Sequence, residues 1–209
     1  MKKYFIKTPW WLRKIYGGYT WQVPGKQNTV YLTFDDGPHP EVTPFVLDQL
    51  KEHGAKATFF CIGKNVVAYP EVYRRILEEG HAVGNHTHHH LNGWKTKNEA
   101  YLQDVAEAAK YIDSGLFRPP YGRITRYQAA CIRHLLKDYT AKIIMWDVLS
   151  ADFDTALNGE DCLVNVVKHI KPGAIIVFHD SEKAWDRLKI CLPGTLNFLQ
   201  EKKLNVAKL

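Results

Sequence analysis

The chain of 209 residues contains no apolar run of the roughly 20 residues that a membrane-spanning helix needs. Its first residues begin like a signal peptide, but Lys7, Pro9 and Arg13 interrupt the apolar segment and no small-residue cleavage site follows. We therefore expect a cytoplasmic protein without a transmembrane segment. Association with the cell envelope stays open at this point.

Cysteine is also scarce. The four cysteines, Cys61, Cys131, Cys162 and Cys191, are far apart and form no C-x-x-C pair. In a chain of this length they predict neither a disulfide framework nor a structural zinc site. We expect buried free thiols in a reducing compartment.

Runs of basic residues interleaved with aromatic residues are missing, although the formal net charge is +6. The scattered lysines and arginines argue against a nucleic-acid partner. An anionic polymer or a lipid surface remains compatible with this charge. Internal repeats, linkers and low-complexity tracts are missing too, which indicates one domain.

Apolar runs that are typical of strands alternate with amphipathic stretches that are typical of helices. We expect strands at 29–34, 57–62, 81–85, 116–118, 141–148, 174–178 and 204–207, and helices at 40–53, 70–79, 98–112, 125–137, 161–170 and 193–202. This alternation predicts an α/β fold with a parallel sheet and helical crossovers. It fits a barrel or an open, doubly wound sheet.

The first 28 residues are unusually rich in aromatic side chains, at Trp10, Trp11, Tyr16, Tyr19 and Trp21. We expect residues 1–28 to form an extension that packs its aromatics on a catalytic domain of residues 29–209. The alternative is an interfacial helix through which residues 1–22 make peripheral membrane contact, with basic side chains at the lipid headgroups.

Polar residues stand where several predicted strands end. They are Asp35-Asp36, Asn85-His86, Arg118, Trp146-Asp147 and His179-Asp180. In parallel α/β folds the carboxyl ends of the strands carry the active site. We expect these residues to meet there.

Two of these segments suggest a metal site. Asp35 and Asp36 precede Gly37 and could be an ordinary turn, but two adjacent carboxylates repel each other unless a cation lies nearby. His86 and His90 have the i, i+4 spacing that places two imidazoles on one face of a helical turn. The alternative is a surface histidine tract. With one carboxylate they would form a His2Asp site with open positions.

Other segments are less specific when read locally. Arg118-Pro119-Pro120-Tyr121 is either a loop stiffened by proline or a device that holds Arg118 against a carboxylate and offers a backbone N–H to an oxyanion. His179 is either a strand-end histidine bonded to Asp180 or part of the polar cluster. Asp152 alone indicates only a turn.

Taken together, residues 29–200 resemble the polysaccharide deacetylase family, also called the NodB-homology family or carbohydrate esterase family 4. The resemblance rests on motifs in the family's order: Thr33-Phe34-Asp35-Asp36-Gly37, His86-Thr87-His88-His89-His90, Arg118-Pro119-Pro120-Tyr121, Asp152-Phe153 and Val177-Phe178-His179. It implies a distorted (β/α) barrel of about seven strands.

The resemblance also implies roles for the site residues. Asp35 would be the catalytic base, oriented by Arg118, and the metal ligands would be Asp36, His86 and His90. The backbone amide of Tyr121 would bind the oxyanion, and His179 would be the general acid, partnered by Asp152. The chain departs from the family at Phe153, where tryptophan is common, and at Val177, where leucine is usual.

The expected function is metal-dependent removal of acetyl groups from the N-acetylated sugars of a glycan. The enzyme would be a hydrolase of carbon–nitrogen bonds other than peptide bonds. Its cofactor would be a divalent metal, with zinc the first expectation, and its partner an acetylated glycan. Three alternatives remain: an amidase that acts on a small molecule, a glycan-binding module without catalysis, and a structural protein with a histidine-rich surface tract.

Overall fold

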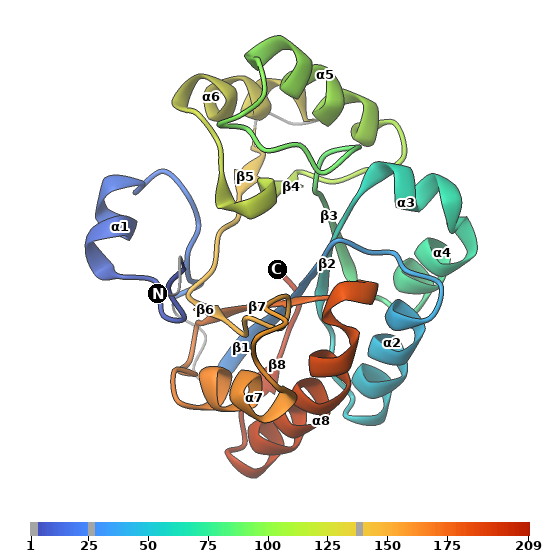
Figure 1. Cartoon of the computed structure of the whole chain (residues 1–209), viewed down its shortest axis with the longest axis vertical. Helices are drawn as coiled ribbons and strands as arrows, with labels where there is room; N and C mark the ends of the chain where they lie inside the picture. Colours follow the sequence, from blue (N-terminus) through green and yellow to red (C-terminus); the bar gives the residue numbers. More distant parts are fainter. Residues whose placement is uncertain (1–3, 25–27, 137–139) are drawn as a thin grey trace.

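The computed structural model describes residues 4–24, 28–136 and 140–209. Its strands are β1 (Thr29–Asp35), β2 (Thr58–Cys61), β3 (Ala82–Asn85), β4 (Leu116–Phe117), β5 (Lys142–Ile143), β6 (Val148–Leu149), β7 (Ile175–His179) and β8 (Asn205–Val206). All strand pairs are parallel, in the order β5-β4-β3-β2-β1-β7-β6, with β8 beside the start of β1. The sheet curls into an incomplete barrel (Figure 1), so the open-sheet alternative is wrong.

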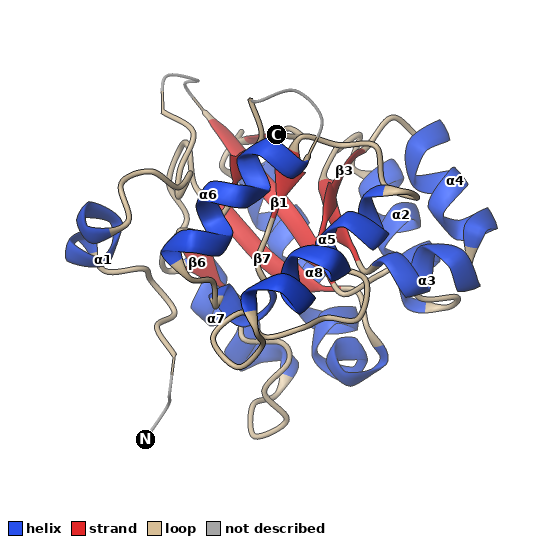
Figure 2. Cartoon of the chain, turned by 90° about the horizontal axis from the view of Figure 1, so that it is seen from above, coloured by secondary structure: helices blue, strands red, loops and turns tan. Residues whose placement is uncertain are grey.

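Helices surround the sheet on its outer side (Figure 2). They are α2 (Val42–Glu52), α3 (Gly63–Ala68), α4 (Pro70–Glu78), α5 (Asn98–Ala109), α6 (Arg126–Leu135), α7 (Gly159–Val167) and α8 (Trp185–Glu201), with short 3-10 turns η1 (Pro120–Gly122) and η2 (Glu182–Ala184). A further short helix, α1 (Trp10–Ile15), lies to one side of the sheet, in the N-terminal segment. The start of α6 follows from its sequence: Thr125 and Gln128 form a capping box.

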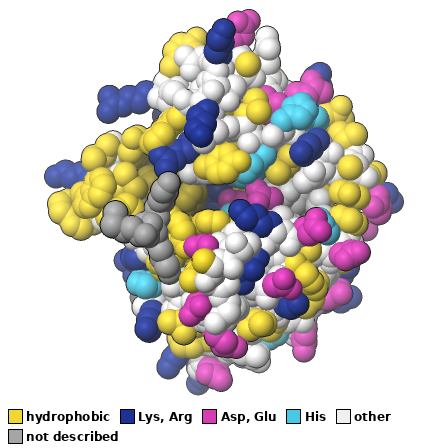
Figure 3. Space-filling view, in the orientation of Figure 1, with side chains coloured by type: hydrophobic (Ala, Val, Ile, Leu, Met, Phe, Trp, Pro, Cys, Tyr) yellow, Lys and Arg dark blue, Asp and Glu magenta, His cyan; other side chains and the backbone are white. Residues whose placement is uncertain are grey.

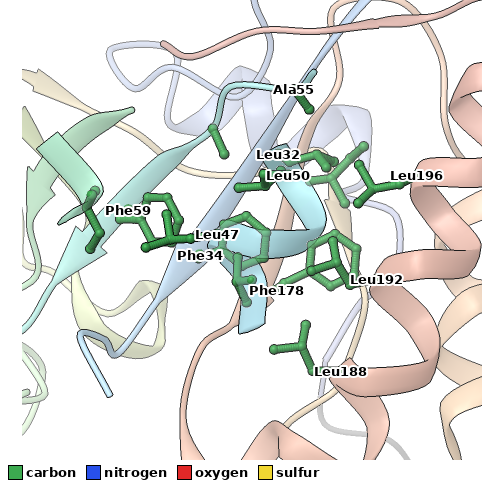
Figure 4. Packing of buried hydrophobic residues seen from close by; sticks show 14 of the residues in the cluster. Leu32, Phe34, Leu47, Leu50, Ala55, Phe59, Phe178, Leu188, Leu192 and Leu196 are labelled. Atoms are coloured by element: carbon green, nitrogen blue, oxygen red, sulfur yellow. The ribbon is translucent and has the colours of Figure 1, made fainter. Parts of the chain in front are cut away.

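The main core lies between the outer face of the sheet and its helices. The rings of Phe34 and Phe59 stack at 5.1 Å, and those of Phe34 and Phe178 at 5.7 Å. Leucines of α2 and α8 cover these rings (Figure 4), so three neighbouring strands are held by one apolar layer. This layer fixes the relative positions of the strand ends that carry the polar residues.

The strand expected at 141–148 is wrong as a single element. β5 pairs with β4 at one end of the sheet, whereas β6 pairs with β7 at the other. The intervening residues 144–147 cross the opening of the barrel and bond to the N-terminal segment instead. The N–H of Met145 donates to Thr20 (2.8 Å), and that of Thr8 to Asp147 (2.9 Å).

Two helix predictions also need correction. The last helix begins at Trp185, eight residues before the expected start, and Pro193 lies inside it. The buried side chains of Leu188, Leu192 and Leu196 form one apolar stripe on both sides of the proline, and that stripe holds the helix together. The short helix α3 was not expected, and Lys137, the expected end of α6, lies outside the described residues.

The N-terminal segment is attached through Asp147, whose side chain is fully buried. The carboxylate of Asp147 accepts hydrogen bonds from Lys7 Nζ (2.6 Å), Gln22 Nε2 (2.7 Å) and the Arg13 guanidinium. Three donors from one segment therefore converge on one buried acid. Lys7 and Arg13 are ion-paired within the chain.

All four cysteines are free thiols, as expected, and three of them are buried. Among the helices of the described residues, none combines the length and the apolar character required to cross a membrane.

Candidate active site

The two adjacent aspartates at the end of β1 point to different partners. Asp35 is 4% exposed, and its Oδ1 accepts a hydrogen bond from Arg118 NH1 at 2.6 Å. Asp36 has a positive φ of 81°, a conformation that few residues other than glycine and asparagine adopt. Its carboxylate approaches His86 and His90. The charge of Asp35 is therefore offset by Arg118, whereas Asp36 faces two imidazoles.

Asp36, His86 and His90 form a group that fits a metal ion. Their donor atoms all lie within 4.8 Å of one another. Oδ1 of Asp36 is 3.2 Å from His90 Nε2 and 3.6 Å from His86 Nε2, yet it is buried without a hydrogen-bond partner among the described residues. One carboxylate and two imidazoles form a common donor set for a catalytic divalent metal such as zinc.

The tautomer of His86 is set by its second ring nitrogen. His86 Nδ1 lies 2.7 Å from the backbone carbonyl oxygen of Arg118, so Nδ1 carries the proton and Nε2 is free to ligate. Burial lowers the pKa of His86 to about 4, which keeps the ring neutral near pH 7. Burial raises the pKa of Asp36, but the contact with His90 and the charge of His179 hold it well below its ordinary value.

The helical turn expected at 86–90 is wrong. These residues form a loop in which Thr87 and His90 have φ values of 65° and 59°. The two imidazoles therefore share one side because the loop folds back on itself. Their rings lie 5.1 Å apart.

Two further residues hold this loop. The sequence predicted no supporting role for either of them. Asp104 Oδ2 on α5 accepts the backbone N–H groups of His88 (2.8 Å) and His89 (2.9 Å). Asn85 Oδ1 accepts the N–H of Thr87 at 2.8 Å. The signal for Asp104 was an acid on the buried face of an amphipathic helix, which requires a buried partner.

Arg118 is fully buried behind Asp35. Besides the carboxylate, its guanidinium donates to Thr33 Oγ1 (2.7 Å), Ile144 O (3.2 Å) and Met145 O (3.1 Å). Burial lowers the pKa of Arg118, and the charge of Asp35 opposes this effect. So many fixed bonds hold both Arg118 and the carboxylate of Asp35 in one orientation.

His179 ends β7 directly opposite Asp35 in the sheet register. Its Nδ1 bonds to Asp152 Oδ1 at 2.7 Å, and its backbone N–H donates to Asp152 Oδ2 at 2.8 Å. Burial lowers the pKa of His179, but the charge and hydrogen bond of fully buried Asp152 outweigh it and raise the pKa to about 9. The ring of Phe153 packs edge-on against His179 at 5.2 Å.

Asp180, the alternative partner of His179, faces elsewhere. It accepts hydrogen bonds from the N–H of Gly37 (3.1 Å) and from Thr43 Oγ1 (2.5 Å). Burial raises its pKa to about 8. A Cβ on Gly37 would lie 2.0 Å from Asp180 Oδ2, which explains the glycine. Asp180 therefore holds the turn that follows Asp36.

A cavity of about 600 Å³, called the central cavity below, collects the sequence-predicted residues. Six of them line it: Asp35, Asp36, His86, His90, Tyr121 and His179. Arg118 and Asp152 lie behind this wall, each fully buried. Tyr121 is 61% exposed, and its ring lies 4.6 Å from that of His90. Acidic and histidine side chains are visible together in a hollow of the surface in Figure 3.

Comparison with known proteins gives consistent matches. The family model "Polysaccharide deacetylase" matches residues 22–140. A peptidoglycan-N-acetylglucosamine deacetylase of Bacillus cereus is 36% identical over 170 residues, covering 78% of each chain. A chitooligosaccharide deacetylase of Azorhizobium caulinodans is 34% identical over 166 residues, covering 76% of this chain and 77% of the other.

Among solved structures, the peptidoglycan N-acetylglucosamine deacetylase Bc1960 superposes with a TM-score of 0.81 at 29% identity. The match covers 95% of this chain and 94% of that one. That protein was solved in complex with 4-naphthalen-1-yl-N-oxidanyl-benzamide, a hydroxamic acid.

Proposed function

The chain belongs to the polysaccharide deacetylase family and is a hydrolase of carbon–nitrogen bonds, and on this premise we propose that it removes the N-acetyl group from sugars of a glycan. One observation carries the proposal: a His2Asp donor group, an Arg–Asp pair and an Asp–His pair converge on the same cavity. A binding module would need neither a buried base nor a buried acid.

The substrate we propose contains N-acetylglucosamine. The relatives are named for peptidoglycan N-acetylglucosamine and for chitooligosaccharides, and in both substrates the acetyl group is held by an amide on a hexosamine. The central cavity of about 600 Å³ falls in the usual size range of ligand pockets.

Asp36, His86 and His90 would hold a divalent metal, most simply zinc, which supplies Lewis-acid polarisation of the acetyl carbonyl and a water of lowered pKa. The hydroxamic acid bound to the related Bc1960 is a class of molecule that chelates metals. We expect hydroxamates to inhibit this chain as well.

Asp35 would act as the general base. Its carboxylate lines the cavity, and the hydrogen bond from Arg118 NH1 fixes one of its oxygens. The other oxygen is then available to take a proton from the attacking water. Arg118 touches no substrate in this scheme and positions Asp35.

His179 would act as the general acid. Because Asp152 occupies Nδ1, Nε2 is the ring nitrogen available to the cavity, and a pKa of about 9 keeps the ring protonated at neutral pH. The water oxygen bonds to the carbonyl carbon, the C–N bond breaks, and His179 gives its proton to the departing nitrogen. The products are acetate and a free amino sugar. The Tyr121 backbone N–H is proposed to stabilise the oxyanion.

The experiment is acetate release from a panel of peptidoglycan fragments, chito-oligosaccharides and small N-acetyl amides. We expect release from at least one glycan and a loss of about 1,000-fold or more in the Asp35→Asn variant, which removes the base without changing its size. Metal content measured on both proteins is the control, because Asp35 is not among the ligands.

The alternatives give different results in the same panel. Release from the small amides alone would favour the small-molecule amidase. No release from any compound, with glycan binding retained, would favour the binding module.

A further inference from the structure

A second cavity, called the aromatic cavity, lies beside the central one. Its volume is about 280 Å³, and its walls come from the N-terminal segment on one side and from η1 and the crossing residues 144–147 on the other. Four residues line both cavities: Tyr4, Tyr121, Trp146 and Leu149. An occupant of the aromatic cavity would therefore adjoin a sugar in the central cavity.

The walls of the aromatic cavity are built of aromatic rings and aliphatic side chains. Thr8 and Arg123 are the exceptions, and three polar groups of the walls are already used within the chain. The indole N–H groups of Trp21 and Trp94 and the hydroxyl of Thr8 all donate to backbone carbonyls, at 3.1, 3.0 and 2.7 Å. A sugar placed against the apolar part of these walls would leave hydroxyls unpaired, at a cost in free energy, whereas a hydrocarbon chain would not.

The outer side of the same segment is also apolar. Phe5, Trp10, Trp11 and Ile15 are 56%, 74%, 44% and 58% exposed. Figure 3 shows hydrophobic side chains gathered over the N-terminal segment, next to the hollow that holds acidic and histidine side chains. An exposed apolar patch of this kind marks an interaction surface, and lipid is one partner that fits it.

We propose that the aromatic cavity binds the hydrocarbon chain of a lipid-linked acetylated sugar. This inference rests on the proposed deacetylase function and names its substrate class. In this arrangement the sugar amide lies among Asp35, Asp36 and His179. The hydrocarbon chain of the lipid extends past Tyr121 and Trp146 under the N-terminal segment.

The test compares alkyl glycosides of N-acetylglucosamine that carry methyl, butyl and octyl groups, each below its critical micelle concentration. We expect kcat/KM for acetate release to rise with chain length, by about tenfold or more from methyl to octyl, because each methylene that enters the cavity leaves water. Chito-oligosaccharides of increasing length are assayed in parallel.

Two substitutions on α1 form a matched pair. Leu12 lines the aromatic cavity, whereas Ile15 lies on the same helix outside it and is exposed. Leu12→Glu should reduce the octyl-to-methyl ratio of kcat/KM to near one. Ile15→Glu should leave that ratio unchanged, since these monomeric substrates need no lipid surface.

The outcomes separate the two proposals. Acetate release that is independent of alkyl length, or that rises with the number of sugars alone, overturns the lipid inference and leaves the deacetylase proposal standing. No acetate from any of these compounds or from the glycan panel refutes the proposed function itself. If Leu12→Glu does not fold, the chain-length series of the wild type still decides.

Discussion

At the residue scale, two neighbouring acids take different positions because the backbone turns between them. Asp35 still belongs to β1 and meets Arg118, whereas the positive φ of Asp36 sends its carboxylate toward the two histidines. Gly37 and Asp180 hold that turn. The different roles proposed for the two acids therefore depend on local backbone geometry and on the side chains that each one meets.

The Asp152–His179 pair predicts a pH dependence. His179 must be protonated to give up its proton, so activity should fall as the pH rises through about 9. Asp152→Asn removes the negative charge that raises the pKa of His179, whereas burial still lowers that pKa. The alkaline limb of the pH profile should therefore move down by about two pH units or more. A pH profile of kcat/KM measures the shift.

Asp186→Asn, which changes an exposed acid on α8, serves as the control and should keep the wild-type profile. An unchanged alkaline limb in Asp152→Asn would show that the pair does not set the protonation of His179.

The grouping of Asp36, His86 and His90 was predictable from the sequence, because they stand in motifs of fixed spacing at the ends of strands. Their support was not predictable. Asp104 lies on α5, fourteen positions beyond His90 in the chain, and Asp180 next to His179 turns away from it. Supporting contacts of this kind depend on tertiary packing, which patterns in a single sequence do not encode.

At the scale of elements, the N-terminal segment takes the place of a missing strand. It bonds to residues 144–148 where the barrel is open, through Lys7–Val148 and Thr20–Ile144 bridges. The sequence predicted the strands and helices well where apolar periodicity is strong. It failed at 141–148, because an apolar run reads as one strand even where its two halves pair at opposite ends of the sheet.

The attachment of this segment is testable through Asp147. Asp147→Ala removes the buried acid that pairs with Lys7 and Arg13, and we expect the free energy of unfolding to fall by about 2–3 kcal/mol, since both cations are partly exposed and regain water. Urea unfolding measures this loss, and proteolysis should cut the segment faster.

Asp48→Ala is the matched control, because the Asp48–Arg75 pair is on the surface and should be worth less than about 1 kcal/mol. Equal losses in the two variants would contradict the anchoring role of Asp147.

At the scale of the whole molecule, global stability should depend on buried histidines. Burial lowers the pKa of His81 to about 4, and its Nδ1 accepts the N–H of Ala57 at 3.1 Å. The unfolded chain takes up this proton near pH 6.5, before the folded chain does. The contribution of His81 is therefore present above about pH 6.5 and lost as the pH falls through 4.

His81→Gln isolates this contribution, because glutamine can still accept the N–H of Ala57 but does not titrate. Between pH 7 and 4 the wild type should lose about 2 kcal/mol more of its unfolding free energy than the variant. Parallel curves for the two proteins would rule out His81 as an acid-sensitive group.

The parallel curled sheet with its helical layer is the part of the fold that the sequence predicts, and the comparison with Bc1960 confirms it. The location of the protein and the division at residue 28 stay predictions.

The central claim is that Asp36, His86 and His90 hold the metal that deacetylation needs. The test removes metal from the protein with a chelator and then titrates the protein with Zn²⁺. Acetate release from the best glycan of the panel is the readout. We predict that release is lost on chelation and returns to a plateau at one zinc per chain, and that His90→Ala shows no such return. Undiminished release from metal-free protein, or a His90→Ala titration like that of the wild type, would contradict it.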